Sequence, residues 1–140
     1  MDPTTYKDWM EVANYRAMDA EAIKEKQPSS VGSVYMAGYA IECSLKALLQ
    51  KRGIPTPTYG KEGHNLHELW RKSGLRFSDL QDTQGTQTFF LQDWNTNLRY
   101  QRDLPDRLGL EIKDLLEGAK QLNQWIQTQI RRSKPRKPKK

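Results

Sequence analysis

The sequence predicts an all-α protein, an up-and-down bundle of four to five helices. Apolar residues recur at steps of three and four along several segments, strand-like alternation is almost absent, and prolines separate the periodic segments. A chain of 140 residues with 36% hydrophobic content has the size and composition of one domain. We expect a helical bundle over residues 1–131 and a disordered basic tail over residues 132–140.

The first helix is predicted to start with Asp2 as its N-cap and Pro3 in its first turn. It should stop before Pro28, because a residue that precedes proline disfavours the helical conformation. Its apolar face repeats at three- and four-residue steps: Tyr6, Met10, Ala13, Ala17, Ala20 and Ile23.

The second helix is predicted to begin at Ser29 or Ser30, either of which can cap it, and to end at Gly53 before Pro55. Its core stripe consists of Val34, Gly38, Ile41, Leu45 and Leu48. Cys43 lies in this apolar run, so we expect a buried thiol rather than a reactive one.

Three shorter segments follow. The proline and glycine content of residues 54–63 predicts a loop. Residues 65–72 are predicted to form a short helix, in which Asn65 and Glu68 have the spacing of a capping box. Residues 86–102 are a fourth helical candidate with a less regular pattern.

The last helix has the clearest periodicity, with Pro105 near its start. Its stripe is Leu108, Ile112, Leu115, Ala119, Leu122, Ile126 and Ile130. Leu116 and Trp125 widen its apolar face. Since Trp94 and Trp125 extend beyond the core stripes, we expect a two-fold homodimer.

The formal net charge of +6 comes from the C-terminus. The last ten residues, RRSKPRKPKK, contain 7 of the 23 basic residues and no acid. Such a tail either binds phosphates through salt-dependent counterion release or only keeps the chain soluble.

Several classes of protein are excluded. No apolar run is long enough to span a membrane, and the N-terminus does not resemble a secretory signal. With a single cysteine, the composition suits the cytoplasm. We expect no cofactor and no metal, since the His64 and His67 pair has no further residues at ligand spacing.

Glu42 and Lys46 stand in the middle of the second helix, each one position beyond a core residue. Four residues apart, with the acid first, they can pair along the helix surface. One interpretation is an ion pair at the edge of the stripe, with both charged ends near solvent. The other is that they line a cleft.

Four segments together resemble the HEPN family of small helical domains of bacteria and archaea: YMAGYAIECSLKALLQKRG, GHNLHELW, WNTNLRY and the helix that ends near NQWI. The resemblance covers residues 8–130. It implies a homodimeric helical bundle, frequent pairing with a minimal nucleotidyltransferase, and metal-free RNA cleavage in the toxin members of the family.

The ribonuclease signature of that family is an Arg followed, after about four to six residues, by a His. The comparable segment here, residues 99–108, contains no His, and neither His64 nor His67 completes the motif. Metal-free cleavage needs groups that exchange protons near neutral pH, which Arg does not do. Arg99 and Arg102 can still hold phosphate, and Tyr100 can stack on a base.

The sequence therefore leaves two functions open. The first is a non-catalytic module that binds RNA, nucleotide or a partner protein in a toxin-antitoxin or defence system with a nucleotidyltransferase. The second is a ribonuclease toxin with a degenerate site. The catalytic candidates are Arg99, Tyr100 and His64, and the binding candidates are Arg99, Tyr100, Arg102, Lys46 and Glu42. Alternatively, Tyr100 packs in the fold, Arg99 pairs with an acid such as Glu42, and His64 packs against a helix end.

Overall fold

The structure is a computed structural model that describes residues 5–55, 65–82, 84–101, 103–104 and 109–133. These ranges contain helices and no strand, which confirms the predicted all-α class. The helices are α1 (Tyr6–Lys26), α2 (Val31–Lys51), α4 (Leu66–Lys72), α5 (Thr86–Gln92) and α6 (Ile112–Arg132), with 3-10 turns η1 (Phe77–Asp79) and η2 (Thr96–Tyr100).

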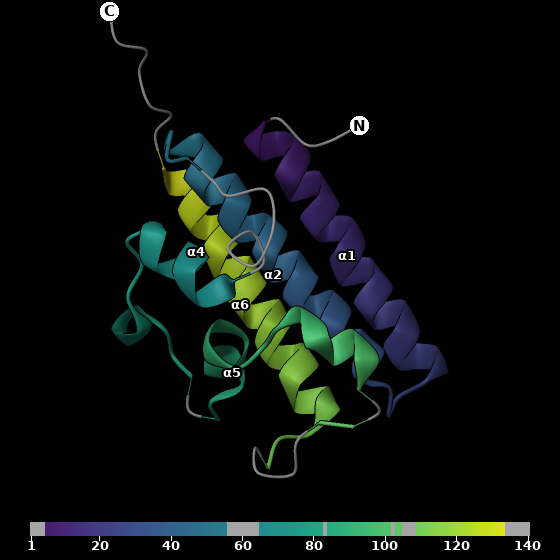
Figure 1. Cartoon of the computed structure of the whole chain (residues 1–140). Coiled ribbons are helices and arrows are strands. Elements are labelled where there is room, and N and C mark those ends of the chain that lie inside the picture. The colour runs from purple at the N-terminus through teal and green to yellow at the C-terminus, as the bar shows by residue number, and fades with distance from the viewer. Residues whose placement is uncertain (1–4, 56–64, 83, 102, 105–108, 134–140) are drawn as a thin grey trace, which may run out of the picture.

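The long helix α2 lies between the other two long helices, α1 and α6 (Figure 1). It packs extensively against both, whereas α1 and α6 barely touch each other. The short helices α4 and α5 lie on the opposite side of the bundle from α1 (Figure 1). Because α2 has neighbours on more than one side, most of its residues are buried, including polar ones.

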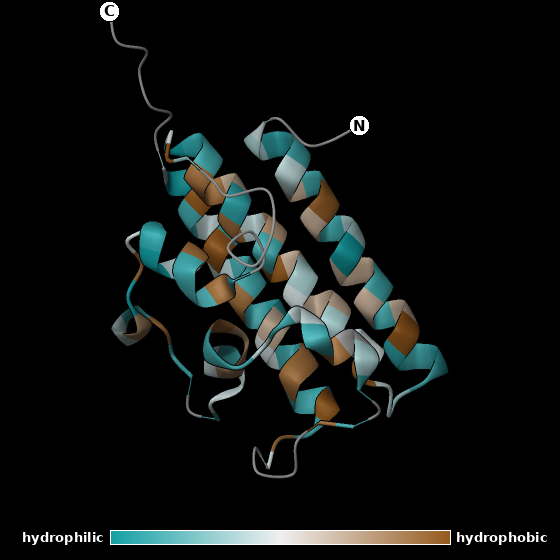
Figure 2. Ribbon diagram, viewed as in Figure 1, coloured by the Kyte–Doolittle hydropathy of each residue, from teal (hydrophilic) through white to brown (hydrophobic). Residues whose placement is uncertain are grey.

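Helix α6 has the amphipathic pattern that the sequence predicts. Hydrophilic and hydrophobic residues alternate around it in Figure 2, and its stripe residues from Leu115 to Ile130 are buried. It begins at Ile112, while the predicted start around Pro105 and Leu108 lies outside the described residues. It extends to Arg132, one residue into the predicted tail, and Ser133 is its C-cap.

Side-chain caps set the starts of the first two helices. Thr5 Oγ1 accepts a hydrogen bond from the Asp8 amide at 3.1 Å, and the Asp8 carboxylate accepts one from the Thr5 amide at 3.2 Å. The prediction of Asp2 as the cap of α1 is therefore wrong, because this capping box starts the helix at Tyr6. The predicted Ser30 cap of α2 is confirmed, with its Oγ 3.1 Å from the Gly32 amide.

The predicted helix over residues 86–102 is wrong as a continuous element. It divides into α5 and η2, separated by residues 93–95. At this break Trp94 turns inward and stacks on Tyr35 of α2, with ring centroids 5.9 Å apart. Gly38 makes this possible, since a Cβ at that position would lie 2.1 Å from atoms of the Trp94 ring. Trp94 is therefore buried, and the prediction that it is available for a dimer surface is wrong.

Lys51, the last residue of α2, and Arg52, its C-cap, hold the C-terminal ends of three helices together. The Arg52 guanidinium donates to the carbonyl of Ser73, the C-cap of α4, at 2.6 Å and to the Oγ of Ser133, the C-cap of α6, at 3.1 Å. Lys51 Nζ donates to the Ile130 carbonyl at 2.7 Å. These bonds supply side-chain donors at helix ends, where the last carbonyls have no regular partner within the helix. Of the helices placed by the structure, none combines the length and apolarity needed to cross a membrane.

Candidate functional site

Glu42 and Lys46 form an ion pair that is buried. The Lys46 Nζ donates to Glu42 Oε2 at 3.1 Å, and the two residues are 2% and 1% exposed, respectively. The predicted pairing is confirmed, but the interpretation that places the pair at a solvent-exposed edge is wrong. The reason is α1, whose Trp9 ring lies over this face of α2 with its centroid 5.0 Å from Lys46 Nζ.

The ion pair belongs to a polar row along α2. Tyr35, Tyr39, Glu42 and Lys46 follow one another at steps of four, three and four residues, which places them on one side of the helix. The rings of Tyr35 and Tyr39 meet edge to face with centroids 5.8 Å apart. Since Tyr35 also stacks on Trp94, the row runs from the α5–η2 break to the Trp9 contact with α1.

Burial and the Glu42 charge raise the pKa values of two neighbouring groups, the Cys43 thiol and the Tyr39 hydroxyl. Burial, reinforced by the nearby carboxylate, raises the pKa of the Cys43 thiol to about 12. The same two causes raise the pKa of the Tyr39 hydroxyl above 10.0. Both groups are therefore neutral near pH 7, and the predicted burial of Cys43 is confirmed.

The predicted Arg-Tyr segment lies in η2, which packs against α2 (Figure 1, green). Asn95 caps this turn by accepting from the Asn97 amide at 2.9 Å, and Leu98 anchors it in the core. Tyr100 is 75% exposed, so the interpretation in which it packs in the fold is wrong. The Arg99 backbone belongs to η2.

The structure brings some of the predicted site residues together. It joins Glu42 to Lys46, and it places the η2 segment that carries Tyr100 beside their helix. The predicted residues His64 and Arg102, and the side chain of Arg99, lie outside what the structure describes. Sequence reasoning missed Trp9, Tyr35 and Tyr39, although the spacing of the two tyrosines ahead of Glu42 and Lys46 was a readable signal.

A family model described as "HEPN domain" matches residues 6–129. The chain belongs to the HEPN family. The match runs from the first residue of α1 almost to the end of α6 and so includes both the polar row and η2. No curated protein and no solved structure matches the chain.

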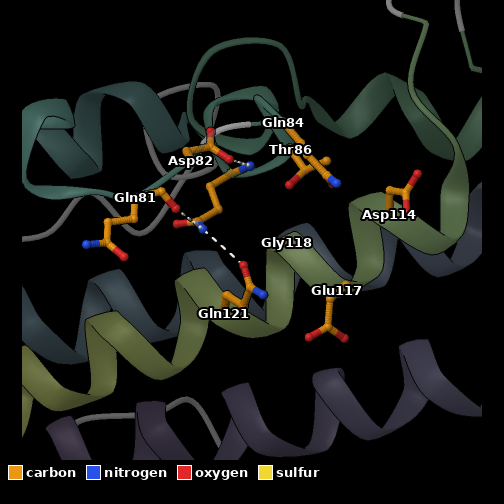
Figure 3. A pocket seen from close by; sticks show the side chains of 9 residues that line it. Gln81, Asp82, Gln84, Thr86, Asp114, Glu117, Gly118 and Gln121 are labelled. Atoms are coloured by element: carbon orange, nitrogen blue, oxygen red, sulfur yellow. Dashed lines mark hydrogen bonds between the residues drawn. The ribbon is translucent and has the colours of Figure 1, made fainter.

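The HEPN chain also has a polar pocket of about 270 Å³ between residues 81–87 and the first half of α6 (Figure 3). Asp82 lines it, but its carboxylate is already bonded: it accepts from the amides of Gln87 and Thr88 at 3.1 and 2.7 Å. Gln87 Nε2 bridges the Gln81 carbonyl and Gln121 Oε1 at 3.2 and 3.3 Å. These bonds attach α5 to α6, so we assign the pocket a structural role.

The described residues form no metal site. Asp114 and Glu117 also line the pocket, but in Figure 3 Glu117 points away from Asp82. Among the described residues, no group of three or more His, Cys, Asp or Glu side chains could hold a metal ion.

A wider groove, of about 730 Å³, separates α1 from α6. It exists because α1 and α6 barely touch, and because much of its floor is alanine, including Ala37 and Ala40 of α2. Met18 of α1 lines this groove and is exposed, and Tyr15 on the same helix is also exposed. Of the predicted site residues whose side chains the structure describes, Glu42, Lys46 and Tyr100, none lines the groove or the pocket.

Proposed function

We propose that this chain is a non-catalytic HEPN module that binds RNA or nucleotide through the η2 segment. The observation that carries the proposal is Tyr100, an aromatic side chain that is 75% exposed on a turn anchored by Leu98 and packed against α2. An exposed ring next to Arg99, and close in sequence to Arg102, combines a stacking surface with cations for phosphate.

In this proposal Glu42 and Lys46 position the site and do not contact the ligand. A phosphate needs access to the Lys46 ammonium, and Lys46 is 2% exposed beneath Trp9. The pair lies on the same helix as Tyr35, which stacks on Trp94 just before η2. By fixing α1 on α2, the ion pair would stabilise one side of α2, the helix against which η2 packs.

The absence of a catalytic His supports binding over cleavage. The chain contains two histidines, His64 and His67, and residues 99–108 contain none. We further propose a homodimer, supported by the exposed Met18 that lines the α1–α6 groove, and a nucleotidyltransferase partner within a toxin-antitoxin or defence system, supported by family membership. A monomer by light scattering at tens of micromolar would contradict the dimer.

The test of binding uses a gel assay of the purified protein with total RNA in EDTA. We expect a mobility shift without cleavage, and loss of the shift in the Arg99→Ala, Tyr100→Ala double variant, which removes the cation and the ring, with unchanged helical circular dichroism and melting. Wild-type binding in the double variant would reject the η2 site. Cleavage in EDTA that is lost in His64→Ala would instead establish the degenerate ribonuclease.

A further inference from the structure

A row of four aromatic rings leads from the core to the surface on the side of the bundle away from α1. The ring of Trp125 in α6 lies 5.7 Å from that of Trp70 in α4, and Trp70 lies 5.8 Å from Phe77 in η1. Phe77 in turn stacks on His67 of α4 at 6.2 Å, with the two rings 26° from parallel. Trp70 is buried and Trp125 is half-buried, whereas Phe77 is 36% exposed and His67 is exposed.

The outer rings are held by well-fixed elements. Trp70 belongs to the main hydrophobic core. The end of α4 is tied to α2 and α6 by Arg52, which binds Ser73 and Ser133. A ring that stacks on such a base loses little conformational entropy when it contacts a ligand. Phe77 is therefore presented as a preorganised surface.

Basic residues lie close in sequence to these rings. Arg71 lies four residues after His67, hence on the same face of α4, and Arg76 directly precedes Phe77. Both arginines are exposed, and Lys72 lies between them in sequence. Glu68 already engages Arg71 through two hydrogen bonds, at 2.6 and 3.0 Å. Among the ion pairs found in the described part of the chain, Lys72 and Arg76 have no acidic partner.

More cations lie at the same end of the molecule. The Arg52 contacts bring the C-terminal ends of α4 and α6 together, and Arg131 and Arg132 of α6 are exposed there. Cations at helix C-termini also stabilise helices through the dipole. That effect accounts for Lys72 and Arg132, but it does not account for an exposed aromatic ring beside Arg76.

We propose that His67, Arg76 and Phe77, which we name the α4–η1 face, bind single-stranded nucleic acid. Bases stack on Phe77 and His67, and the adjacent phosphate binds Arg76. The α4–η1 face shares no residue with the η2 site. The proposal rests on the proposed function only because RNA would then be the natural ligand of this face. Stacking and phosphate contacts do not use the 2′-hydroxyl, so single strands of DNA bind here as well.

The test measures fluorescence anisotropy of labelled U and dT oligonucleotides, each 12 nucleotides long, with the full chain. Phe77→Leu keeps an apolar side chain but removes the ring, and we expect it to weaken binding of both strands by about fivefold or more. Phe77→Tyr should bind within about twofold of wild type, because the ring remains. The matched control is Tyr15→Leu, which removes an exposed ring from α1 and should change nothing.

Charge is tested separately by the salt dependence of the same binding. Arg76→Gln should reduce the slope of log affinity against log salt by about one phosphate contact. Lys7→Gln, which removes an exposed cation from α1, is its control. Melting and circular dichroism of every variant show whether the fold is retained.

The outcomes separate this proposal from the function of the η2 site. Unchanged binding in Phe77→Leu, with wild type binding normally, overturns the α4–η1 face, leaves the η2 site standing, and makes a protein ligand the explanation of the exposed ring. Weaker binding in Phe77→Leu, with the Arg99→Ala, Tyr100→Ala double variant unaffected, supports the face and overturns the η2 site. No binding of either strand by wild type overturns both.

Discussion

The Nζ of Lys46 in α2 lies 5.0 Å from the centroid of the Trp9 ring in α1. Helix α1 buries few apolar side chains fully, only Ala13 and Ala20 among its described residues. Its attachment to α2 therefore depends strongly on contacts such as this one, in which a cation is held between a carboxylate and an aromatic face. A shift of α1 along α2 would remove Trp9 from Lys46, so we infer that the contact helps to set the register of the two helices.

This burial predicts a large cost for removing one partner of the pair. Lys46→Met should lower the free energy of unfolding by about 3 kcal/mol, because it takes the ammonium away from a buried carboxylate. The double variant Glu42→Gln, Lys46→Met should recover part of the loss. Urea unfolding of the single and double variants measures both effects.

The matched control is the exposed pair of Glu68 and Arg71. Glu68→Gln should leave the free energy of unfolding nearly unchanged, since solvent screens that pair. An equally small effect of Lys46→Met would mean that solvent reaches the buried pair in solution.

Periodicity was sufficient to predict the long helices, because each has an apolar face that repeats with the helical period. Periodicity could not predict that Glu42 is buried. A position next to the stripe is an exposed edge only when the helix has neighbours on one side, and α2 has α1 on one side and α6 on another. Which helix covers which face is a long-range property that local spacing does not contain.

The break between α5 and η2 has a similar cause. Local pattern favoured a continuous helix, but the insertion of Trp94 against Gly38 requires the chain to turn at residues 93–95. For the candidate site, the missing His was readable from the sequence alone. The exposure of Tyr100 and the row from Trp125 to His67 were not, because they depend on how separate elements pack.

The second prediction concerns alkaline pH. Because the pKa of Cys43 is raised from 9.0 to about 12 in the folded protein, its contribution to stability is fully present below pH 9. It is lost as the pH rises from 9 toward 12, where the unfolded thiol ionises and the folded one does not. The expected loss is about 1.4 kcal/mol per pH unit in this window.

Urea unfolding between pH 8 and 11 compares wild type with Cys43→Ala. The variant should lose less stability with rising pH, whereas Tyr39, whose pKa is raised chiefly by burial and by the Glu42 charge, is present in both proteins. The Cys43 thiol should also resist a thiol reagent until the protein unfolds. Parallel pH profiles, or rapid labelling of the folded protein, would contradict a buried neutral thiol.

The third prediction separates the C-terminal tail from the helix that precedes it. Ser133 Oγ accepts a hydrogen bond from Arg52 at 3.1 Å and donates one to the Gln129 carbonyl at 2.7 Å, so this residue belongs to the folded bundle. Residues 134–140 carry five basic residues and two prolines, a composition that predicts no packing. Deletion of 134–140 should therefore leave the melting temperature unchanged, whereas deletion of 133–140 should lower it.

The same two deletions test the role of the tail charge. If the tail contacts phosphates, removal of 134–140 flattens the salt dependence of oligonucleotide binding, because fewer counterions are released. A variant with the five basic residues of 134–140 replaced by Gln controls for length and should give the same flattened slope. Equal slopes with and without the tail would instead assign the phosphate contacts to the folded body. Equal melting temperatures for both deletions would show that the bonds of Ser133 do not stabilise the bundle.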